Sequence, residues 1–143
     1  MRPNFWELPL EALDRAEWEA LCDGCGKCCL HKAEDADTGE IHPTNIACRL
    51  LDRENARCMS YRTRRAFVPD CVRLTRSNVG RIGWLPSTCA YRLRAAGRPL
   101  FDWHHLLSGD PESVHRAGMS VRGWTVAEAE AGAIEHHLTD REL

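Results

Sequence analysis

Eight cysteines have the clearest chemistry in this sequence, and four of them fall within eight residues. Residues 22–29 read Cys-Asp-Gly-Cys-Gly-Lys-Cys-Cys, a C-x2-C-x2-C-C run. A spacing of two lets successive thiolates turn back toward one centre, and Gly24 and Gly26 permit the tight backbone of such a loop. The candidate ligands for a metal or cofactor are the run and four single cysteines downstream: Cys22, Cys25, Cys28, Cys29, Cys48, Cys58, Cys71 and Cys89.

The spacing of these cysteines is compatible with two kinds of metal centre. Three cysteines separated by two residues each are typical of the start of a bacterial iron–sulfur run. A zinc ribbon separates two C-x2-C pairs by about 15–20 residues, and no second pair follows the run here. A [4Fe–4S] cluster and a structural zinc ion each take four thiolates. The eight cysteines can thus form two four-thiolate centres, or one centre beside four structural thiols.

The loop that carries the run decides which cysteines share a centre. Cys22, Cys25 and Cys28 belong to one local loop and are expected to serve one centre. Cys29 follows Cys28 directly, so in an extended loop exit its side chain points the opposite way. Cys29 would then join downstream cysteines or lie outside the ligand set. Cys89 begins a predicted helix, whose N-terminus favours a thiolate, and we expect it to be a ligand.

Histidines and enzyme motifs are weaker signals. His31, two residues beyond Cys29, is an alternative ligand, but histidines more often lie on the surface or hydrogen-bond around a metal site. The adjacent pairs at 104–105 and 136–137 lack the i, i+4 spacing of a helical metal site. The sequence has no nucleotide-binding loop, Ser/His/Asp arrangement or H-E-x-x-H motif, and so leaves open whether the protein is an enzyme.

A predicted helix precedes the cysteine run, and a predicted hairpin follows it. Leu10, Leu13 and Leu21 follow helical spacing over residues 9–22 and form an apolar stripe. Gly24 lies just past the end, where a glycine commonly caps a helix. Residues 29–52 predict a β-hairpin whose turn is Asp-Thr-Gly-Glu at 37–40.

The second half of the chain is predicted to hold an irregular stretch and short helices. Residues 53–86 contain prolines, glycines and many arginines without a clean period, so metal ligands would have to pin this stretch. Ser87 is expected to cap a helix over residues 89–96, and Asp110 with Pro111 to start another. Thr125 and Glu128 match a capping box for a last helix that runs toward residue 137.

The composition is that of a globular protein. The chain has 143 residues, of which 43% are hydrophobic and 28% charged, and these values exclude a disordered or collagen-like chain. The length suits a single cysteine-cluster domain over residues 1–143. With the elements above, it predicts the α+β class: a small, irregular, metal-stapled single domain with several short helices and a β-hairpin.

Hydropathy and the N-terminal residues indicate the compartment. No apolar run approaches the roughly 18 residues of a membrane helix, and the first residues do not match a secretory or transit signal. We therefore expect a cytoplasmic protein without a membrane partner. Because cytoplasmic thiols stay reduced, this compartment disfavours a disulfide framework and favours metal ligation.

Charge is unevenly distributed along the chain. The formal net charge is −2, yet residues 49–98 carry 12 arginines and 3 acids. A basic segment can meet phosphate, an acidic protein or an anionic cluster within its own fold. The acidic segments 1–48 and 99–143 are expected to neutralise this basic middle. Nucleic acid is therefore not expected as a partner, and the expected partner is a redox or other protein of unknown identity.

At this level of detail the chain resembles the CxxCxxCC cysteine-cluster proteins, which are zinc- or iron-chelating, and within them the YcgN-like branch. The matching stretches are CDGCGKCCL at 22–30, DTGEIHPTNIACRLLD at 37–52, VPDCVRLT at 68–75, WLPSTCAYRL at 84–93 and WHHLLSGDPESVH at 103–115. They cover most of the chain, and all eight cysteine positions are present. The resemblance implies a metal or iron–sulfur site built by the cysteines, and it brings no particular reaction.

Two functional hypotheses remain open. The first is a small iron–sulfur protein with a [4Fe–4S] cluster and a redox or cluster-dependent role, which the thiolate-only ligand set and the C-x2-C-x2-C run favour. The second is a zinc-stapled interaction module, in which the metal replaces a missing core and the basic middle forms a partner-binding surface. The irregular stretch at 53–86 favours this second hypothesis.

Overall fold

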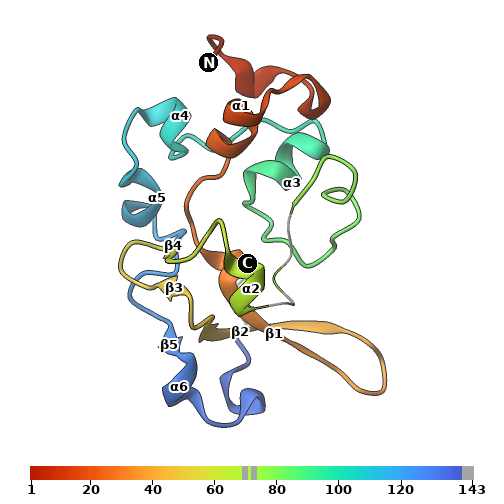
Figure 1. Ribbon diagram of the computed structural model, residues 1–143, viewed down its shortest axis with the longest axis vertical. Coiled ribbons are helices and arrows are strands. Elements are labelled where there is room, and N and C mark those ends of the chain that lie inside the picture. The colour runs from red at the N-terminus through yellow and green to blue at the C-terminus, as the bar shows by residue number, and fades with distance from the viewer. Residues whose placement is uncertain (69–70, 72–73, 140–143) are drawn as a thin grey trace. The chain divides into compact units, whose positions relative to one another are not determined.

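The structure is a computed structural model that describes residues 1–68, 71 and 74–139. Backbone contacts divide the chain into two compact units. Unit 1 comprises Met1–Cys25 and Arg73–Met119, and unit 2 comprises Gly26–Val72 and Ser120–Leu143. The chain therefore passes from one unit to the other within the cysteine run. Figure 1 labels the helices and strands of both units.

Unit 1 is helical in its described residues. Its 3-10 helices are η1 (Phe5–Glu7) and η2 (Leu10–Ala12), and its α-helices are α1 (Arg15–Ala20), α3 (Ala90–Ala95), α4 (His105–Ser108) and α5 (Ser113–Arg116). Each is at most two turns long. Such short helices are marginal by themselves, so their stability comes from packing.

The helix predicted over residues 9–22 is divided in two, whereas its apolar stripe is confirmed. The Asp14 carboxylate accepts from the Glu17 N–H at 2.8 Å, and the Glu17 carboxylate accepts from the Asp14 N–H at 3.0 Å. This capping box starts α1 and separates it from η2. Leu10, Leu13 and Leu21 are all buried, because both short helices turn their leucines toward one core.

That core joins the N-terminal helices to α3. Its buried members are Phe5, Leu10, Leu13, Leu21, Val79, Leu85, Ala90, Tyr91 and Leu100. The rings of Trp18 and Tyr91 lie 4.7 Å apart, and the Tyr91 hydroxyl donates to the Trp18 carbonyl at 2.7 Å. The pair therefore buries aromatic surface without leaving the hydroxyl unsatisfied.

The predicted starts of the two later helices are shifted. Cys89, and not Ser87, occupies the N-cap of α3. Asp110 does cap its turn, since its carboxylate accepts from the Glu112 N–H at 2.9 Å. The regular helix α5 nevertheless begins only after that turn. Short polar side chains thus mark helix starts to within a few residues.

Unit 2 is built on a three-stranded sheet of β1 (Leu30–Glu34), β2 (Ile41–Ala47) and β5 (Val126–Ala127), in the order β1-β2-β5. β1 and β2 are antiparallel, with Leu30 opposite Ala47, and so confirm the predicted hairpin. In its turn the Asp35 carboxylate accepts from the backbone N–H groups of Asp37 and Thr38, at 2.8 and 3.0 Å. This Asx-type bonding is a standard way to reverse a chain.

The remaining elements of unit 2 are short, and only β4 and α2 fall within the stretch at 53–86 that is predicted to be irregular. They are η3 (Lys27–Cys29), β3 (Leu51–Asp52), β4 (Arg57–Cys58), α2 (Arg64–Phe67), α6 (Glu128–Ala131) and η4 (Ile134–His137). β3 and β4 form a second, antiparallel pair. A small apolar core of Leu30, Ala47, Leu51, Ala56 and Val121 lies among them.

The capping box predicted at Thr125 and Glu128 is wrong. The two residues between them form β5, which pairs in parallel with β2. The Thr125 hydroxyl donates to the Val121 carbonyl at 3.2 Å, and α6 ends before Gly132, whose φ is 72°. Pairing with a strand about 80 residues earlier overrides the local helix signal.

The fold class is α+β, as predicted, with several short helices and two small sheets. Regular elements cover little of the chain, so turns and loops position most of the cysteines. No helix in the described part of the chain is long and apolar enough to cross a membrane.

Candidate metal centre

Backbone pairing in unit 2 brings together three cysteines that are far apart in the sequence. The Cys48 N–H donates to the Cys29 carbonyl at 2.8 Å, one step beyond the last pair of the hairpin. The Leu51 N–H then donates to the Cys48 carbonyl at 2.8 Å. Leu51 lies opposite Cys58 in the β3–β4 pair. One hydrogen-bonded path therefore connects the segments of Cys29, Cys48 and Cys58.

Cys28 joins this group through a tight turn. Cys28 and Cys29 lie in the 3-10 helix η3, which follows Gly26 at a φ of 75°. Their thiols are hydrogen-bonded to each other. The extended loop exit that would point the two side chains in opposite directions is thus not formed. The angle between successive side chains is smaller in a helical turn than in a strand.

The electrostatics of Cys29 and Cys48 report the same neighbourhood. The pKa of the Cys29 thiol is raised, first by its hydrogen bond with Cys28 and by burial, and then by Cys58 and Cys48. The pKa of Cys48 is raised by burial, and to a smaller extent by the nearby Glu128 carboxylate, Cys58 and Cys71. Because such effects fall off with distance, they agree with the backbone pairing that brings the segments of Cys29, Cys48 and Cys58 together.

Neighbouring thiols are not yet a coordination sphere. Among the residues that the structure describes, no three cysteine, histidine, aspartate or glutamate side chains converge as a metal ion requires. The fold therefore gathers the thiol-bearing segments of unit 2 without setting the coordination geometry. The donor set itself fits zinc or an iron–sulfur cluster, since both take soft thiolates.

Three predicted ligands lie in unit 1. Cys22 is exposed, Cys25 is buried and Cys89 is half-buried beside the leucine core. The Asp23 carboxylate accepts from the Cys25 N–H at 2.9 Å, and the whole Asp23 side chain is buried. The aspartate thus stabilises the turn between the first two cysteines, and the sequence alone did not indicate this role.

Histidines with two hydrogen bonds are poor candidates for ligands. The His104 ring donates from Nε2 to the Leu21 carbonyl at 2.8 Å and accepts at Nδ1 from the Leu106 N–H at 3.1 Å. Burial lowers the pKa of this ring. His31, the alternative ligand beyond the run, has its Nε2 2.9 Å from a carboxylate oxygen of Glu128. His104 thus has both ring nitrogens engaged, whereas the contact of His31 with a carboxylate is compatible with metal ligation through its other nitrogen, and His31 stays an alternative ligand.

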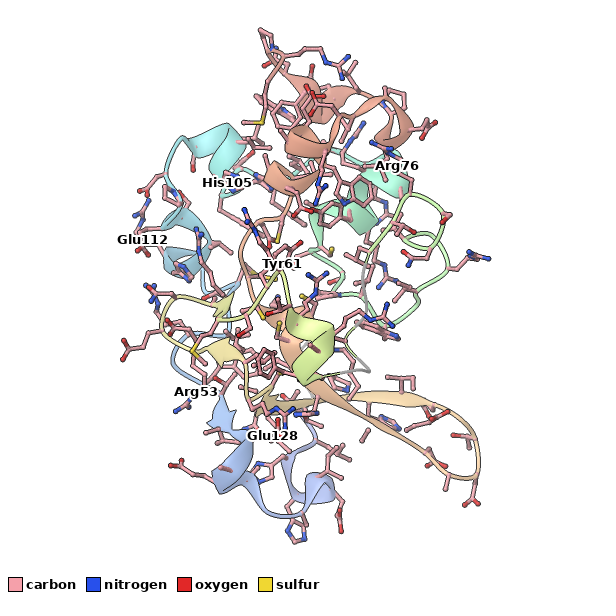
Figure 2. The ribbon with its side chains drawn as sticks, viewed as in Figure 1. Arg53, Tyr61, Arg76, His105, Glu112 and Glu128 are labelled. Atoms are coloured by element: carbon pink, nitrogen blue, oxygen red, sulfur yellow. The ribbon has the colours of Figure 1, made fainter. Side chains whose placement is uncertain are left out.

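Glu128, predicted to be part of a helix cap, instead lies near the Cys48 thiol. Its carboxylate accepts from His31 and also from the Arg49 N–H, at 3.0 Å. The contact with His31 is the main cause that holds the pKa of Glu128 below its ordinary value, and the hydrogen bond from the Arg49 N–H lowers this pKa further. The side chain is labelled in Figure 2. This arrangement could have been anticipated only by predicting a strand, and not a helix, at residues 126–127.

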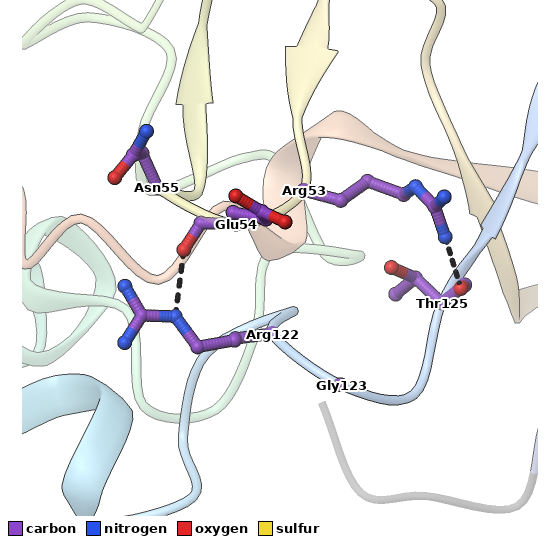
Figure 3. Close-up of a pocket in the computed structure, with 6 residues that line it drawn as sticks. All are labelled: Arg53, Glu54, Asn55, Arg122, Gly123 and Thr125. Atoms are coloured by element: carbon purple, nitrogen blue, oxygen red, sulfur yellow. Dashed lines mark hydrogen bonds between the residues drawn. The ribbon is translucent and has the colours of Figure 1, made fainter.

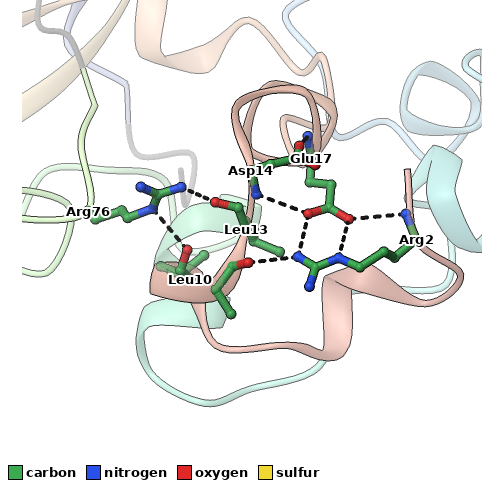
Figure 4. Close-up of polar contacts among 7 residues, drawn as sticks. Arg2, Leu10, Leu13, Asp14, Glu17 and Arg76 are labelled. Atoms are coloured by element: carbon green, nitrogen blue, oxygen red, sulfur yellow. Dashed lines mark hydrogen bonds and ion pairs between the residues drawn. The ribbon is translucent and has the colours of Figure 1, made fainter.

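Arginines of the basic middle segment bond largely to backbone carbonyls. The Arg76 guanidinium donates to the carbonyls of Leu10 and Leu13 (Figure 4). Arg64 donates to the Tyr61 carbonyl at 2.6 Å, and its guanidinium lies 4.2 Å from the centroid of that ring. These side chains therefore satisfy carbonyls that irregular loops leave unpaired, and the neutralisation of the basic middle by the acidic segments stays a prediction.

A shallow hollow of about 640 Å³ in unit 2 also contains two arginines (Figure 3). Arg53 donates to the Thr125 carbonyl at 2.6 Å, and Arg122 donates to the Glu54 carbonyl at 2.6 Å. The two bonds run in opposite directions between segment 53–55 and segment 122–125. They tie the later segment to the β3–β4 turn, and thereby position β5.

The cysteine-bearing part of the chain matches a known domain. Residues 21–90 match the CxxCxxCC family, described as "Putative zinc- or iron-chelating domain". The matched region contains all eight cysteines, so the predicted family is confirmed and metal binding is supported. No solved structure matches the chain.

Relatives cover nearly the whole chain. It is 66% identical to a UPF0260 protein of Rhizorhabdus wittichii over 140 residues, which are 97% of this chain and 96% of that protein. It is 64% identical to a UPF0260 protein of Rhodobacter capsulatus, over 91% of this chain and 88% of that protein. For a UPF0260 protein of Gluconacetobacter diazotrophicus the identity is 52%, over 96% of this chain and 87% of that protein. The chain belongs to the UPF0260 family.

Proposed function

We propose that this protein is an iron–sulfur protein with a redox or cluster-dependent role. The observation that carries the proposal is the group of neighbouring thiols in unit 2, contributed by segments up to about 40 residues apart. Thiolates without a histidine or carboxylate among them are the usual ligands of iron–sulfur clusters. The C-x2-C-x2-C spacing supports the same chemistry.

The proposed ligands are the eight cysteines of the run and the downstream positions. Within unit 2, the proposed centre would take the four thiolates of Cys29, Cys48, Cys58 and Cys71, with Cys28 beside the first of them. Cys22, Cys25 and Cys89 are proposed as ligands from their sequence positions. A [4Fe–4S] cluster would supply one-electron chemistry, at a potential that depends on charge, hydrogen bonds and solvent exposure around the sulfurs.

A zinc-stapled module is the second candidate, and one observation favours it. The apolar core of unit 2 contains only five buried residues within the described part, and a structural zinc ion can supply folding energy that such a core lacks. In that case the metal organises the fold and the protein acts through its surface.

Metal and sulfide analysis separates the two candidates. The full chain would be purified without oxygen, and iron, acid-labile sulfide and zinc would be measured together with the absorption spectrum. Iron and sulfide in equal amounts, with a broad absorption near 400 nm that is lost on exposure to a strong iron chelator, are expected. Stoichiometric zinc without sulfide would replace the iron–sulfur proposal by the zinc module. Absence of both metals after reconstitution with iron and sulfide or with zinc would refute metal binding.

A further inference from the structure

We propose that Glu128 is a positioning residue of the thiol centre in unit 2, because its carboxylate joins the two chain segments that carry Cys29 and Cys48. The inference rests on the proposed metal-binding function and extends it to a residue outside the matched domain at 21–90. It assigns no ligand role to Glu128.

A single carboxylate oxygen makes both contacts. Glu128 Oε2 accepts from the Arg49 N–H at 3.0 Å and lies 2.9 Å from His31 Nε2. Arg49 directly follows Cys48, and His31 comes two residues after Cys29. The carboxylate therefore bridges Arg49, next to Cys48, and His31, on the strand β1 that begins directly after Cys29. Charge-assisted hydrogen bonds of this kind are about twice as strong as neutral ones.

The sheet delivers Glu128 to this place. β5 runs parallel to β2, with Val126 opposite Ile46 and Ala127 opposite Ala47. Glu128 directly follows β5 and Cys48 directly follows β2, so Glu128 lies at the end of the β2–β5 pairing. Figure 2 marks Glu128 at the base of this sheet. The C-terminal segment therefore acts as a clamp on the cysteine-bearing hairpin.

The clamp supplements a backbone bond that is already present. The Cys48 N–H donates to the Cys29 carbonyl at 2.8 Å, which sets the distance between the two main chains. The turn at Arg49 is also held by the Leu51 N–H, which donates to the Cys48 carbonyl, and by the Arg49 guanidinium, which donates to the Phe67 carbonyl. The Glu128 carboxylate holds the turn from the other side, and so restricts the direction in which the Cys48 thiol points.

The test compares metal release from four single variants and one double variant of the full chain. Glu128→Ala removes both contacts, Glu128→Gln keeps an acceptor without the charge, and His31→Ala removes one contact. Glu130→Ala, exposed on the same helix α6, is the matched control. Each protein would be loaded with the metal that wild type holds, and release to a chelator would be followed by absorption at 20 °C, where circular dichroism shows that each variant is folded.

Outer hydrogen bonds around metal ligands typically contribute about 10–100-fold to metal affinity. We expect release about 10-fold faster for Glu128→Ala, intermediate rates for Glu128→Gln and His31→Ala, and a wild-type rate for Glu130→Ala. The absorption bands and the metal content at full loading should stay those of wild type. The double variant Glu128→Ala, His31→Ala should release no faster than Glu128→Ala, since both changes remove the same contact.

Three outcomes would overturn the inference. One is a wild-type release rate in Glu128→Ala. Another is a changed spectrum or a reduced metal content in that variant, which would make the carboxylate a ligand. The third applies if Glu128→Ala does not fold: a wild-type rate in the milder His31→Ala variant then refutes the clamp. Failure of wild type itself to bind metal would instead refute the proposed function, so the two failures are distinguishable.

Discussion

Cys29 lies where the turn of η3, the hairpin and the β3–β4 pair come together in unit 2. Its neighbours are the thiols of Cys28, Cys48 and Cys58, and they raise its pKa together with burial. Several thiolates so close together repel one another, whereas a metal cation among them reverses that effect and favours the charged form. The crowding is therefore better suited to metal ligation than to independent free thiols.

Single serine substitutions test which cysteines hold metal. Serine is nearly isosteric with cysteine but is a poor ligand for soft metals. If two four-thiolate centres exist, Cys29→Ser and Cys22→Ser should each remove only part of the bound metal, as measured by elemental analysis. Cys89→Ser should also lower the metal content. Unchanged metal content and spectrum in all eight serine variants would contradict the metal site as a whole.

Gly26 is required at its position for two separate physical reasons. Its φ is 75°, and a Cβ there would lie 3.0 Å from a methyl of Val121 and 3.2 Å from the Cβ of Ala56. Gly24 has a similar φ of 77° but no atom within 4 Å of its added Cβ. Comparing the two glycines therefore distinguishes the cost of backbone strain, which both positions share, from the cost of a steric clash, which arises only at Gly26.

Alanine substitutions at both glycines should reveal that difference. Gly24→Ala should cost only the left-handed backbone penalty of roughly 1–2 kcal/mol. Gly26→Ala should cost clearly more, because Val121 and Ala56 must also move. The measurement is the free energy of unfolding in urea for both variants. Equal losses would show that the close contacts around Gly26 are unimportant.

At the scale of elements, the same sequence signature has two outcomes in this chain. Asp14 and Glu17 form a capping box that starts α1. Thr125 and Glu128 have the same spacing, but the residues between them pair with β2. No strand is assigned among the described residues of unit 1 to compete for the backbone of the first pair, whereas β2 pairs with the residues between Thr125 and Glu128. Capping signals are therefore reliable only where no sheet edge is available.

The pH dependence of stability should show the contribution of the α1 cap. The pKa of Glu17 is lowered from 4.5 to about 2, mainly by the hydrogen bond from the Arg2 guanidinium and then by the backbone of Asp14 (Figure 4). A lowered pKa stabilises the fold above about pH 4.5, and this stabilisation is lost as the pH falls toward 2. Glu17→Gln should therefore lower the melting temperature at pH 7, with a difference from wild type that vanishes near pH 2.

Glu11→Gln provides the control for this prediction, because Glu11 is exposed on the neighbouring helix η2. Its melting temperature should follow that of wild type across the whole pH range. A difference between Glu17→Gln and wild type that stays constant from pH 7 to pH 2 would contradict the assigned role of the Glu17 carboxylate.

At the scale of the molecule, much of residues 26–68 is turn and short strand. Regular elements there are few, and the apolar core of unit 2 is small. A unit with so small an apolar core has little hydrophobic free energy to oppose its conformational entropy. Metal ligation would supply the difference, since metal binding to an otherwise unstable site is folding free energy.

Removal of the metal should therefore loosen the cysteine-bearing region. After chelation, amide hydrogens of residues 22–89 should exchange faster, and the melting transition should become less cooperative. The leucine core formed by η2, α1 and α3 should keep more of its protection, because apolar contacts hold it. A melting curve unchanged by complete metal removal would show that the metal does not stabilise the fold.

Local signals in the sequence determined several features of the protein. The hairpin with its Asp-rich turn, the buried stripe of Leu10, Leu13 and Leu21, and the irregular stretch before residue 86 follow from residues that are close together in the chain. The C-x2-C-x2-C-C run likewise pointed to the metal-chelating family. In each case the information lies within one turn or one spacing pattern.

Only the tertiary structure decided which distant residues meet. The β1–β2 hairpin was predictable from its turn, but only the structure shows that its backbone hydrogen bonds continue to the β3–β4 pair and so bring the segments of Cys29, Cys48 and Cys58 together. The parallel pairing of β5 with β2 turns Glu128 from a predicted helix cap into a link between His31 and the Arg49 turn. Long-range strand pairing is selected by the burial and hydrogen bonding of the whole unit, so no local pattern could have revealed it.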